Sequence, residues 1–307
     1  MSNRLFVLKC ISLFIPFLYF FATLFELPSK IVKNSGGINH VRIPIPEGED
    51  YSIHITSFPV NNVQAHMAIT AISSKDDFRV LVKDSNCSLE KTSAFSKQAS
   101  CSYAVNGGPF QSYIHGGCIG ITISNGRIIN SSHSFQSSVE DNNVAFGVTQ
   151  NNEWVIGNVQ DYSNSGEDYS DIKELITGLN ENGWLVKNST IVSHLDKKRH
   201  APRTAIGINI DAHLVLFQVD GCEHCHTPTG LTMHELATEI SKHAVYSINL
   251  DGGGSSTTVG PGGEVLNHPT CMDYVNIKCE RKVASAVCVK PSHIHSIYHV
   301  AASASKR

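Results

Sequence analysis

Two stretches decide the fold: Leu214-Val-Leu-Phe-Gln-Val-Asp220-Gly221 and Ala244-Val-Tyr-Ser-Ile-Asn-Leu-Asp251-Gly252-Gly253-Gly254-Ser255-Ser256. Each is an apolar run that ends in an aspartate followed by glycine, which predicts a buried strand and then a turn. Between the two runs lies 232–243. Its apolar residues fall at i, i+3, i+4 and i+7, the spacing of an amphipathic helix: Met233, Leu236, Ala237 and Ile240.

Strand, helix and strand in this order predict a right-handed crossover that joins parallel strands. Asp220 and Asp251 then end at the same edge of one sheet, where ligands usually bind in such units. A carboxylate at the end of a buried strand is held rigidly. Both aspartates are therefore candidate catalytic residues, although Asp-Gly alone is also a common turn.

The glycine loop after Asp251 is the strongest site signal in the chain. Three glycines without side chains would leave backbone N–H groups open to a ligand. We therefore expect Gly252, Gly253, Gly254, Ser255 and Ser256 to bind substrate. The alternative is a turn that merely needs glycine.

Two other segments carry the chemistry of anion binding. Arg203 follows Pro202 at the start of a predicted strand and is expected either to grip an anion or to pair with one of the aspartates. At the end of another short strand, the turn Asn106-Gly107-Gly108 is of a kind that can cradle an anion with its amides.

The rest of the chain is rich in hairpins. Four hairpins are predicted, which pair 119–124 with 127–130, 144–149 with 154–157, 184–187 with 190–193, and 203–210 with 214–219. The first has the clearest turn signal, Asn125-Gly126. Short helices are expected at 88–97 and at 171–179. The predicted fold class is α+β, mostly antiparallel mixed sheet with a few helices and a β-α-β unit carrying the site.

Composition bounds the function. The chain has 307 residues with a net charge of −3 and 17% charged residues, enough for one large domain around a sizeable core. No basic stripe or RNA-binding aromatic motif is present, which argues against a nucleic-acid partner. We expect no cofactor and no metal.

The N-terminus differs from the remainder. Arg4 and Lys9 precede an apolar run that ends at Phe25, so residues 1–28 are predicted to be a signal peptide or an N-terminal anchor, the only expected membrane contact. Residues 29–50 are predicted to be a stalk or linker, 51–290 the main domain, and 291–307 a disordered tail. The expected location is the secretory pathway, in the Golgi lumen or secreted.

Cysteines and sequons agree with that compartment. Of nine cysteines, Cys10 lies in the leader; the other eight form an even set typical of disulfides. Cys222-Glu-His-Cys225-His226 suits either a local disulfide or, with free thiols, zinc. Three sequons predict glycosylation at Asn86, Asn130 and Asn188.

The motifs in this order resemble the phosphodiester glycosidase family over about residues 51–290. The residues that carry the resemblance are Pro202-Arg203-Thr-Ala-Ile-Gly, Asp220-Gly221, Ile248-Asn-Leu-Asp251-Gly-Gly-Gly-Ser-Ser, Asn106-Gly107-Gly108-x-Phe110, Cys118-Ile-Gly and Val283-Ala-Ser-Ala-Val-Cys288-Val. Two features depart from the family: Pro109 stands where an aromatic residue is usual, and the Cys222–Cys225 loop is peculiar to this chain.

The resemblance implies a substrate: GlcNAc-α-1-phospho-6-mannose on high-mannose N-glycans of lysosomal enzymes. Hydrolysis would release GlcNAc and expose mannose 6-phosphate, so the implied partners are phosphorylated high-mannose glycoproteins. Asp220 and Asp251 would activate water or stabilise the sugar cation, and Arg203 would hold the phosphate. The family pattern also implies three disulfides, Cys87–Cys118, Cys101–Cys288 and Cys271–Cys279. The alternative is a secreted sugar-phosphate binding protein of the same fold, without turnover or with another specificity.

Overall fold

The computed structural model describes residues 40–48, 51–130, 144–158, 169–179, 183–290 and 298–301. The predicted leader at 1–28 and the start of the predicted stalk lie outside these residues. Within the described ranges, no helix is both long and apolar enough to cross a membrane.

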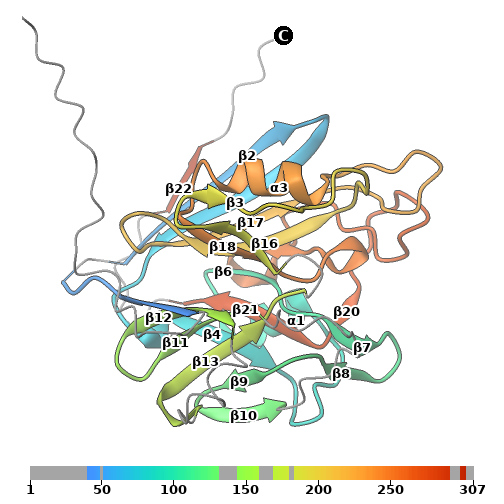
Figure 1. Ribbon diagram of the computed structural model, residues 1–307. Helices are drawn as coiled ribbons and strands as arrows, with labels where there is room; N and C mark the ends of the chain where they lie inside the picture. Colours follow the sequence, from blue (N-terminus) through green and yellow to red (C-terminus); the bar gives the residue numbers. More distant parts are fainter. Residues whose placement is uncertain are drawn as a thin grey trace, which may run out of the picture.

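An eight-stranded sheet forms the upper layer in Figure 1. Its strand order is β15 (Thr190–Ile191), β14 (Trp184–Lys187), β18 (Tyr246–Asn249), β16 (Arg203–Ile208), β17 (Leu214–Val219), β3 (Val63–Ala71), β2 (Ser52–Val60) and β22 (Tyr298–Ala301). Helix α3 (Met233–Ile240) covers its outer face (Figure 1).

A six-stranded sheet forms the lower layer. Its order is β1 (His40–Pro44), β12 (Glu153–Asn158), β11 (Val144–Thr149), β13 (Ile172–Thr177), β9 (Thr122–Ser124) and β10 (Arg127–Asn130). A four-stranded sheet contacts this layer through β4; its order is β19 (Thr258–Val259), β6 (Tyr103–Asn106), β21 (Ser285–Val289) and β4 (Phe78–Val82).

The remaining elements are short. They are the pair β20 (Lys282–Val283) with β5 (Glu90–Lys91), the pair β7 (Phe110–Ser112) with β8 (Gly116–Cys118), and the helix α1 (Thr92–Ala99). The described part of the chain is thus mostly antiparallel sheet with two α-helices, as the α+β prediction requires at the level of fold class.

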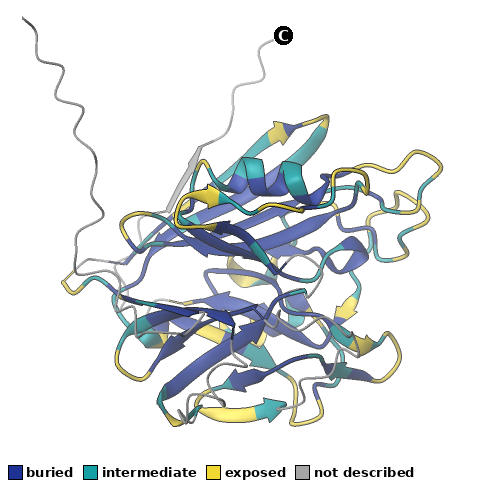
Figure 2. Ribbon diagram, in the orientation of Figure 1, coloured by how far each residue is buried: buried dark blue, intermediate teal, exposed yellow. Residues whose placement is uncertain are grey.

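The main core lies between the upper sheet and the two lower sheets, where Figure 2 shows the buried strands facing each other. Phe146 and Trp154 contribute to it from the lower layer, and Ile206 and Leu216 from the upper one. The rings of Phe146 and Trp154 pack 5.3 Å apart. A second core fills the space between the upper sheet and α3.

Helix α3 forms for the reasons that its sequence predicts. Thr232 caps its first turn, with its hydroxyl accepting from the Glu235 amide at 3.2 Å while the Glu235 carboxylate accepts from the Thr232 amide at 2.9 Å. The expected apolar stripe is buried in the second core: Met233, Leu236, Ala237 and Ile240.

The strands on either side of α3 do not pair with each other. Each pairs antiparallel with β16, which lies between them, so β17 and β18 run in the same direction one strand apart. Because neighbouring strands are about 4.8 Å apart, the backbones of β17 and β18 are separated by about 10 Å.

All four predicted hairpins are confirmed: β9–β10, β11–β12, β14–β15 and β16–β17. The helix predicted at 171–179 is wrong, because 172–177 forms strand β13 between β11 and β9. All six residues of β13 are buried between neighbouring strands, and this packing outweighs the helix-like spacing of the apolar residues. The buried Glu174 carboxylate accepts from the amides of Val80 and Asn125 at 3.0 and 3.2 Å.

Both predicted flanking segments contain strands. The predicted stalk includes β1, which pairs with β12, because its alternating Val41 and Ile43 complete the main core. The predicted disordered tail includes β22, which pairs in parallel with β2 at the edge of the upper sheet.

Candidate functional site

Three predicted site residues meet at one edge of the upper sheet. Arg203 begins β16 opposite Val219, the residue before Asp220. On the other side of β16, Asn249 pairs with Ala205, and Asp251 follows two residues later. The register therefore brings Arg203, Asp220 and Asp251 to the same edge, with the two aspartates on either side of β16.

Asp251 has the environment of an acid–base group. Burial raises its pKa to about 6, against the opposing effects of the Ser255 side chain, the Gly252 amide and the Arg281 charge. The Gly252 amide donates to its carboxylate at 3.0 Å, and the Ser255 hydroxyl makes no hydrogen bond of standard geometry. A carboxyl group with a pKa near the working pH can both take up and release a proton.

The amides of the glycine loop are already paired. Gly252 donates to the Asp251 carboxylate, Gly253 to the Pro202 carbonyl at 2.9 Å, and Gly254 to the Asp273 carboxylate. The next two amides close short turns onto loop carbonyls. The expectation that these amides lie open for a ligand is therefore wrong, because Asp251, carbonyls of the loop itself and the distant residues Pro202 and Asp273 accept from them.

Close packing explains the glycines instead. A Cβ on Gly254 would lie 2.5 Å from Nη2 of Arg281, and a Cβ on Gly253 would lie 2.7 Å from a Glu223 oxygen. Gly253 also has a φ of +57°, which other residues seldom adopt. The loop backbone therefore packs closely against the Arg281 guanidinium and the Glu223 carboxylate.

Arg281 and Asp273 are site residues that the sequence did not reveal. The Arg281 guanidinium donates to the Cys271 carbonyl at 2.6 and 2.9 Å and pairs with Asp273, and its centre lies 4.6 Å from the centroid of the Tyr113 ring. No motif surrounds Arg281. The only available signal is its place two residues after the Cys271–Cys279 loop.

Arg203 lies near the first glycine of the loop. It is buried, donates to the carbonyls of Leu231 and Arg199 at 3.2 and 3.0 Å, and approaches the Gly252 backbone. Part of the guanidinium is thus engaged in fixing neighbouring segments.

Asp220 is a hub of hydrogen bonds. Burial alone would raise its pKa, but the His66, Asn267 and Gln218 side chains outweigh burial and lower it. Its carboxylate accepts from Asn267 at 3.0 Å, from Gln218 at 3.2 Å and from the His268 amide at 3.1 and 3.2 Å, with His66 at 3.6 Å. The lowered pKa keeps this carboxylate ionised at neutral pH, and most of its hydrogen bonds converge on Oδ1.

Asn106 connects the lower strands to the glycine loop. Its amide nitrogen donates to the Asp251 carbonyl at 2.8 Å, and its side-chain oxygen accepts from the Thr204 hydroxyl at 2.7 Å and the Thr257 amide at 3.1 Å. The side chain is buried and acts as a brace.

The two glycines after Asn106 are required by packing. A Cβ on Gly107 would lie 2.3 Å from the Ser285 hydroxyl, and one on Gly108 would lie 2.3 Å from the Thr177 carbonyl. The Gly107 amide donates to the Ser285 carbonyl at 2.9 Å. This geometry does not support the expected anion cradle.

Ser255 and Ser256 are buried, and their hydroxyls have no hydrogen-bond partner in the structure. The same is true of the next two hydroxyls along the chain, on Thr257 and Thr258. A run of unpaired buried hydroxyls beside Asp251 keeps Ser255 and Ser256 as candidates for substrate binding.

Four disulfides brace this region. Three are the implied pairs: Cys87–Cys118, Cys101–Cys288 and Cys271–Cys279. The fourth, Cys222–Cys225, resolves the open alternative as a local disulfide. It closes the loop that holds Glu223 against Gly253, where Glu223 also pairs with Arg199 at 2.7 Å.

The three sequons differ in accessibility. Asn86 and Asn188 are exposed, and Asn188 lies in the β14–β15 turn. The Asn130 amide nitrogen donates to the carbonyls of Cys118 and Gly120 at 2.8 and 3.0 Å. Attachment of a glycan would replace one of the two hydrogens on that nitrogen and so break at least one of these bonds, which is why glycosylation is expected at Asn86 and Asn188 rather than at Asn130.

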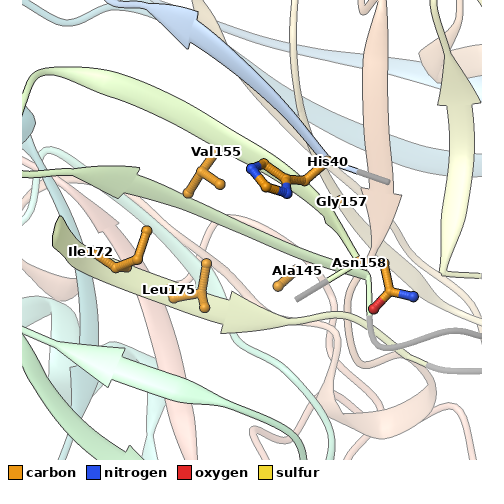
Figure 3. A pocket seen from close by; sticks show the side chains of 7 residues that line it. All are labelled: His40, Ala145, Val155, Gly157, Asn158, Ile172 and Leu175. Atoms are coloured by element: carbon orange, nitrogen blue, oxygen red, sulfur yellow. The ribbon is translucent and has the colours of Figure 1, made fainter. Parts of the chain in front are cut away.

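A small cavity elsewhere is separate from this edge. Figure 3 shows it over the six-stranded sheet, lined by His40, Asn158 and apolar side chains such as Val155 and Leu175. Its mostly apolar lining offers little to a charged substrate.

The fold and the site define a class: a layered, β-rich domain with a carboxyl group of raised pKa and two arginines at one edge of a sheet. The family follows from comparison. The model of the family described as phosphodiester glycosidase matches residues 99–290, and the chain belongs to this family.

Similar proteins have a consistent name. N-acetylglucosamine-1-phosphodiester alpha-N-acetylglucosaminidase of Mus musculus is 30% identical over 211 residues, which cover 62% of this chain and 38% of the mouse protein. The Homo sapiens protein of the same name is 30% identical over 217 residues, covering 63% and 38%. The matched region is thus well under half of each relative's length.

Solved structures share the fold. The zebrafish catalytic domain of that glucosaminidase, described as auto-inhibited by its pro-peptide, superposes with a TM-score of 0.65 at 22% identity, covering 83% of this chain and 89% of the other. A hypothetical protein from Synechocystis superposes with a TM-score of 0.51 at 12% identity, covering 76% and 61%.

Proposed function

We propose that this chain hydrolyses a GlcNAc-α-1-phosphodiester on mannose of phosphorylated high-mannose glycoproteins such as lysosomal enzymes. The reaction releases GlcNAc and exposes mannose 6-phosphate. Family membership and the names of the relatives support the reaction class. The observation that carries the proposal is Asp251, whose pKa is raised to about 6 beside a glycine loop and an arginine.

The reaction needs a general base to activate water, but it does not need a general acid to protonate the leaving group. Water attacks the anomeric carbon, the bond from that carbon to the phosphate oxygen breaks, and the phosphate monoester leaves with the electron pair. Such a leaving group departs as an anion without prior protonation. At neutral pH Asp251 is mostly ionised and accepts the proton of the attacking water.

The cations at the loop suit the phosphate. Arg281 lies against Gly254 and Arg203 lies near Gly252, and Arg281 is the one whose charge lowers the pKa of Asp251. Because the loop amides are occupied, these guanidinium groups, rather than the amides, are the proposed source of positive charge for the leaving phosphate.

The β17–α3–β18 unit carries the site in this proposal, with β16 between its strands. Asp251, at the end of β18, reacts. Asp220, at the end of β17, holds the 267–270 segment that leads to Asp273 and Arg281, and is a positioning residue.

Four disulfides support folding in an oxidising compartment. We therefore propose that the chain works in the secretory pathway, in the Golgi lumen or after secretion, and meets its glycoprotein substrates there.

The test is release of free GlcNAc from GlcNAc-α-1-phospho-6-methyl-mannoside by the full chain, with UDP-GlcNAc as a second substrate. Release from the mannoside supports the proposal. Release from UDP-GlcNAc alone indicates another diester as the substrate. Binding of either compound without GlcNAc release would establish the alternative, a sugar-phosphate binding protein.

A further inference from the structure

Exposed apolar side chains are concentrated beside the candidate site. Among the described residues, eight large apolar side chains are exposed, and six of them lie in two loops. We call these six the tyrosine rim: Tyr113, Ile114, Met272, Tyr274, Val275 and Ile277. A concentration of this kind marks an interaction surface, whereas isolated exposed apolar residues do not.

The two tyrosines of the rim are held in place, although each is 70% exposed. The Arg281 guanidinium lies over the Tyr113 ring, and the His224 ring stacks on Tyr274 with centroids 5.8 Å apart and an angle of 28° between the planes. Each ring thus has one face supported by a protein group, while most of its surface remains in solvent.

A chain of contacts joins both rings to the glycine loop. Arg281 pairs with Asp273, whose carboxylate accepts from the Gly254 amide and whose carbonyl accepts from the His224 amide at 2.9 Å. Through Arg281 and Asp273 the rim is thus joined directly to the glycine loop that follows Asp251.

We propose that the tyrosine rim is a subsite for the oligomannose arm that carries the phosphodiester, with Tyr113 and Tyr274 stacking on pyranose rings. This inference rests on the proposed function. The C–H groups on one face of a pyranose ring carry partial positive charge, and an aromatic face is negative, so a preorganised tyrosine ring complements a sugar face.

The geometry favours sugar over polypeptide. A stable protein interface buries roughly 800 Å² on each partner and has a continuous apolar core. The rim instead presents two supported rings, with the polar residues Asp273 and Asn276 between the apolar ones. Its small apolar platforms beside the reacting centre suit successive sugar units.

The test compares two substrates that differ only beyond the phosphate: the GlcNAc phosphodiester on methyl mannoside and the same diester on a free oligomannose. Tyr274→Ala should raise KM on the oligomannose substrate by about 3- to 10-fold. The loss on the methyl mannoside should be smaller, and Tyr274→Phe, which keeps the ring, should restore binding of the oligomannose.

A matched pair of isoleucines controls for surface changes. Ile277, in the rim, is 63% exposed, and Ile128, in β10, is 52% exposed. Ile277→Ala should weaken oligomannose binding and Ile128→Ala should not. Equal losses on both substrates in Tyr274→Ala, or no loss on either, would overturn the subsite. A loss confined to intact glycoprotein would assign the rim to polypeptide instead.

Direct binding separates this inference from the proposed function. Saturation-transfer NMR with unphosphorylated oligomannose should show contact that Tyr274→Ala removes. If the wild-type protein cleaves no GlcNAc phosphodiester, the proposed function fails, whereas the subsite fails only if the oligomannose does not bind or binds Tyr274→Ala equally well.

Discussion

Asp220 and Asp251 have the same sequence setting and opposite surroundings. Both end a buried strand, precede glycine and lie at one edge of the upper sheet. Asp220 is surrounded by donors that lower its pKa, whereas burial raises the pKa of Asp251 to about 6. A carboxylate that accepts from several donors holds neighbouring segments together, and one with few donors is available for chemistry.

The largest expected effect separates the two aspartates by activity. Asp251→Asn should lower kcat by about 100-fold or more, because the amide cannot accept the proton of water. Asp220→Asn should retain more activity per folded molecule. The measurement is GlcNAc release, with folded protein quantified by near-UV circular dichroism. Equal residual rates in the two variants would remove the distinction.

Arg281 sharpens the comparison, because it accompanies Asp251 and not Asp220. Arg281→Lys keeps the positive charge but loses the two parallel N–H donors of the guanidinium group. It should slow cleavage of the phosphodiester by about 10- to 100-fold. The loss should be smaller on an uncharged aryl GlcNAc glycoside, which has no phosphate to hold. The same two substrates with Arg203→Lys show whether the second arginine contributes. Equal losses on both substrates would indicate a purely structural arginine.

Asp220 should be the more important aspartate for stability. Asp220→Asn turns an NH₂ group toward existing donors and should lower the free energy of unfolding by about 1–3 kcal/mol at pH 7. The folded-state pKa of Asp220 lies below its unfolded value of about 3.9, so its contribution is present above that pH and is lost as the pH falls further. Urea unfolding at pH 7 and pH 3 measures both; an unchanged midpoint at pH 7 would contradict the role.

Asp251 should have the opposite, smaller effect on stability. Its folded-state pKa lies above the unfolded value, so the native protein loses stability as the pH rises from about 4 to 6 and then levels off. Asp251→Asn removes this penalty and should stabilise the protein at pH 7 by on the order of 1–2 kcal/mol. The check is the change in unfolding free energy from pH 4.5 to pH 7, which should be more positive in the variant than in the wild-type protein.

The sequence correctly predicted the features that depend on residues close together in the chain. Apolar runs that end in Asp-Gly located both aspartates, turn residues located four hairpins, and the family resemblance implied three disulfides. The helix expected at 171–179 failed because Ile172 and Leu175 fit helical spacing as well as a strand buried on both faces, and only the neighbouring strands decide between them.

The partners of polar groups could not be predicted. The amides of Gly253 and Gly254 donate to Pro202 and Asp273, which are distant in sequence, and the donors around Asp220 come from 66, 218 and 267–268. Arg281 enters the site because the glycines let it approach, which no local pattern encodes. The sequence therefore showed which residues lie at this edge of the sheet, but only the tertiary contacts distinguish the role of Asp251 from that of Asp220.

The most direct test of the central claim, that Asp251 is the catalytic base, is the pH dependence of kcat/KM on GlcNAc-α-1-phospho-6-methyl-mannoside. The substrate phosphodiester carries one constant charge over this range, so the profile reports the enzyme. We expect kcat/KM to rise tenfold per pH unit below an apparent pKa near 6 and to level off above it. A rate that is constant from pH 4.5 to 8, or that falls as the pH rises through 6, would contradict the assignment of Asp251.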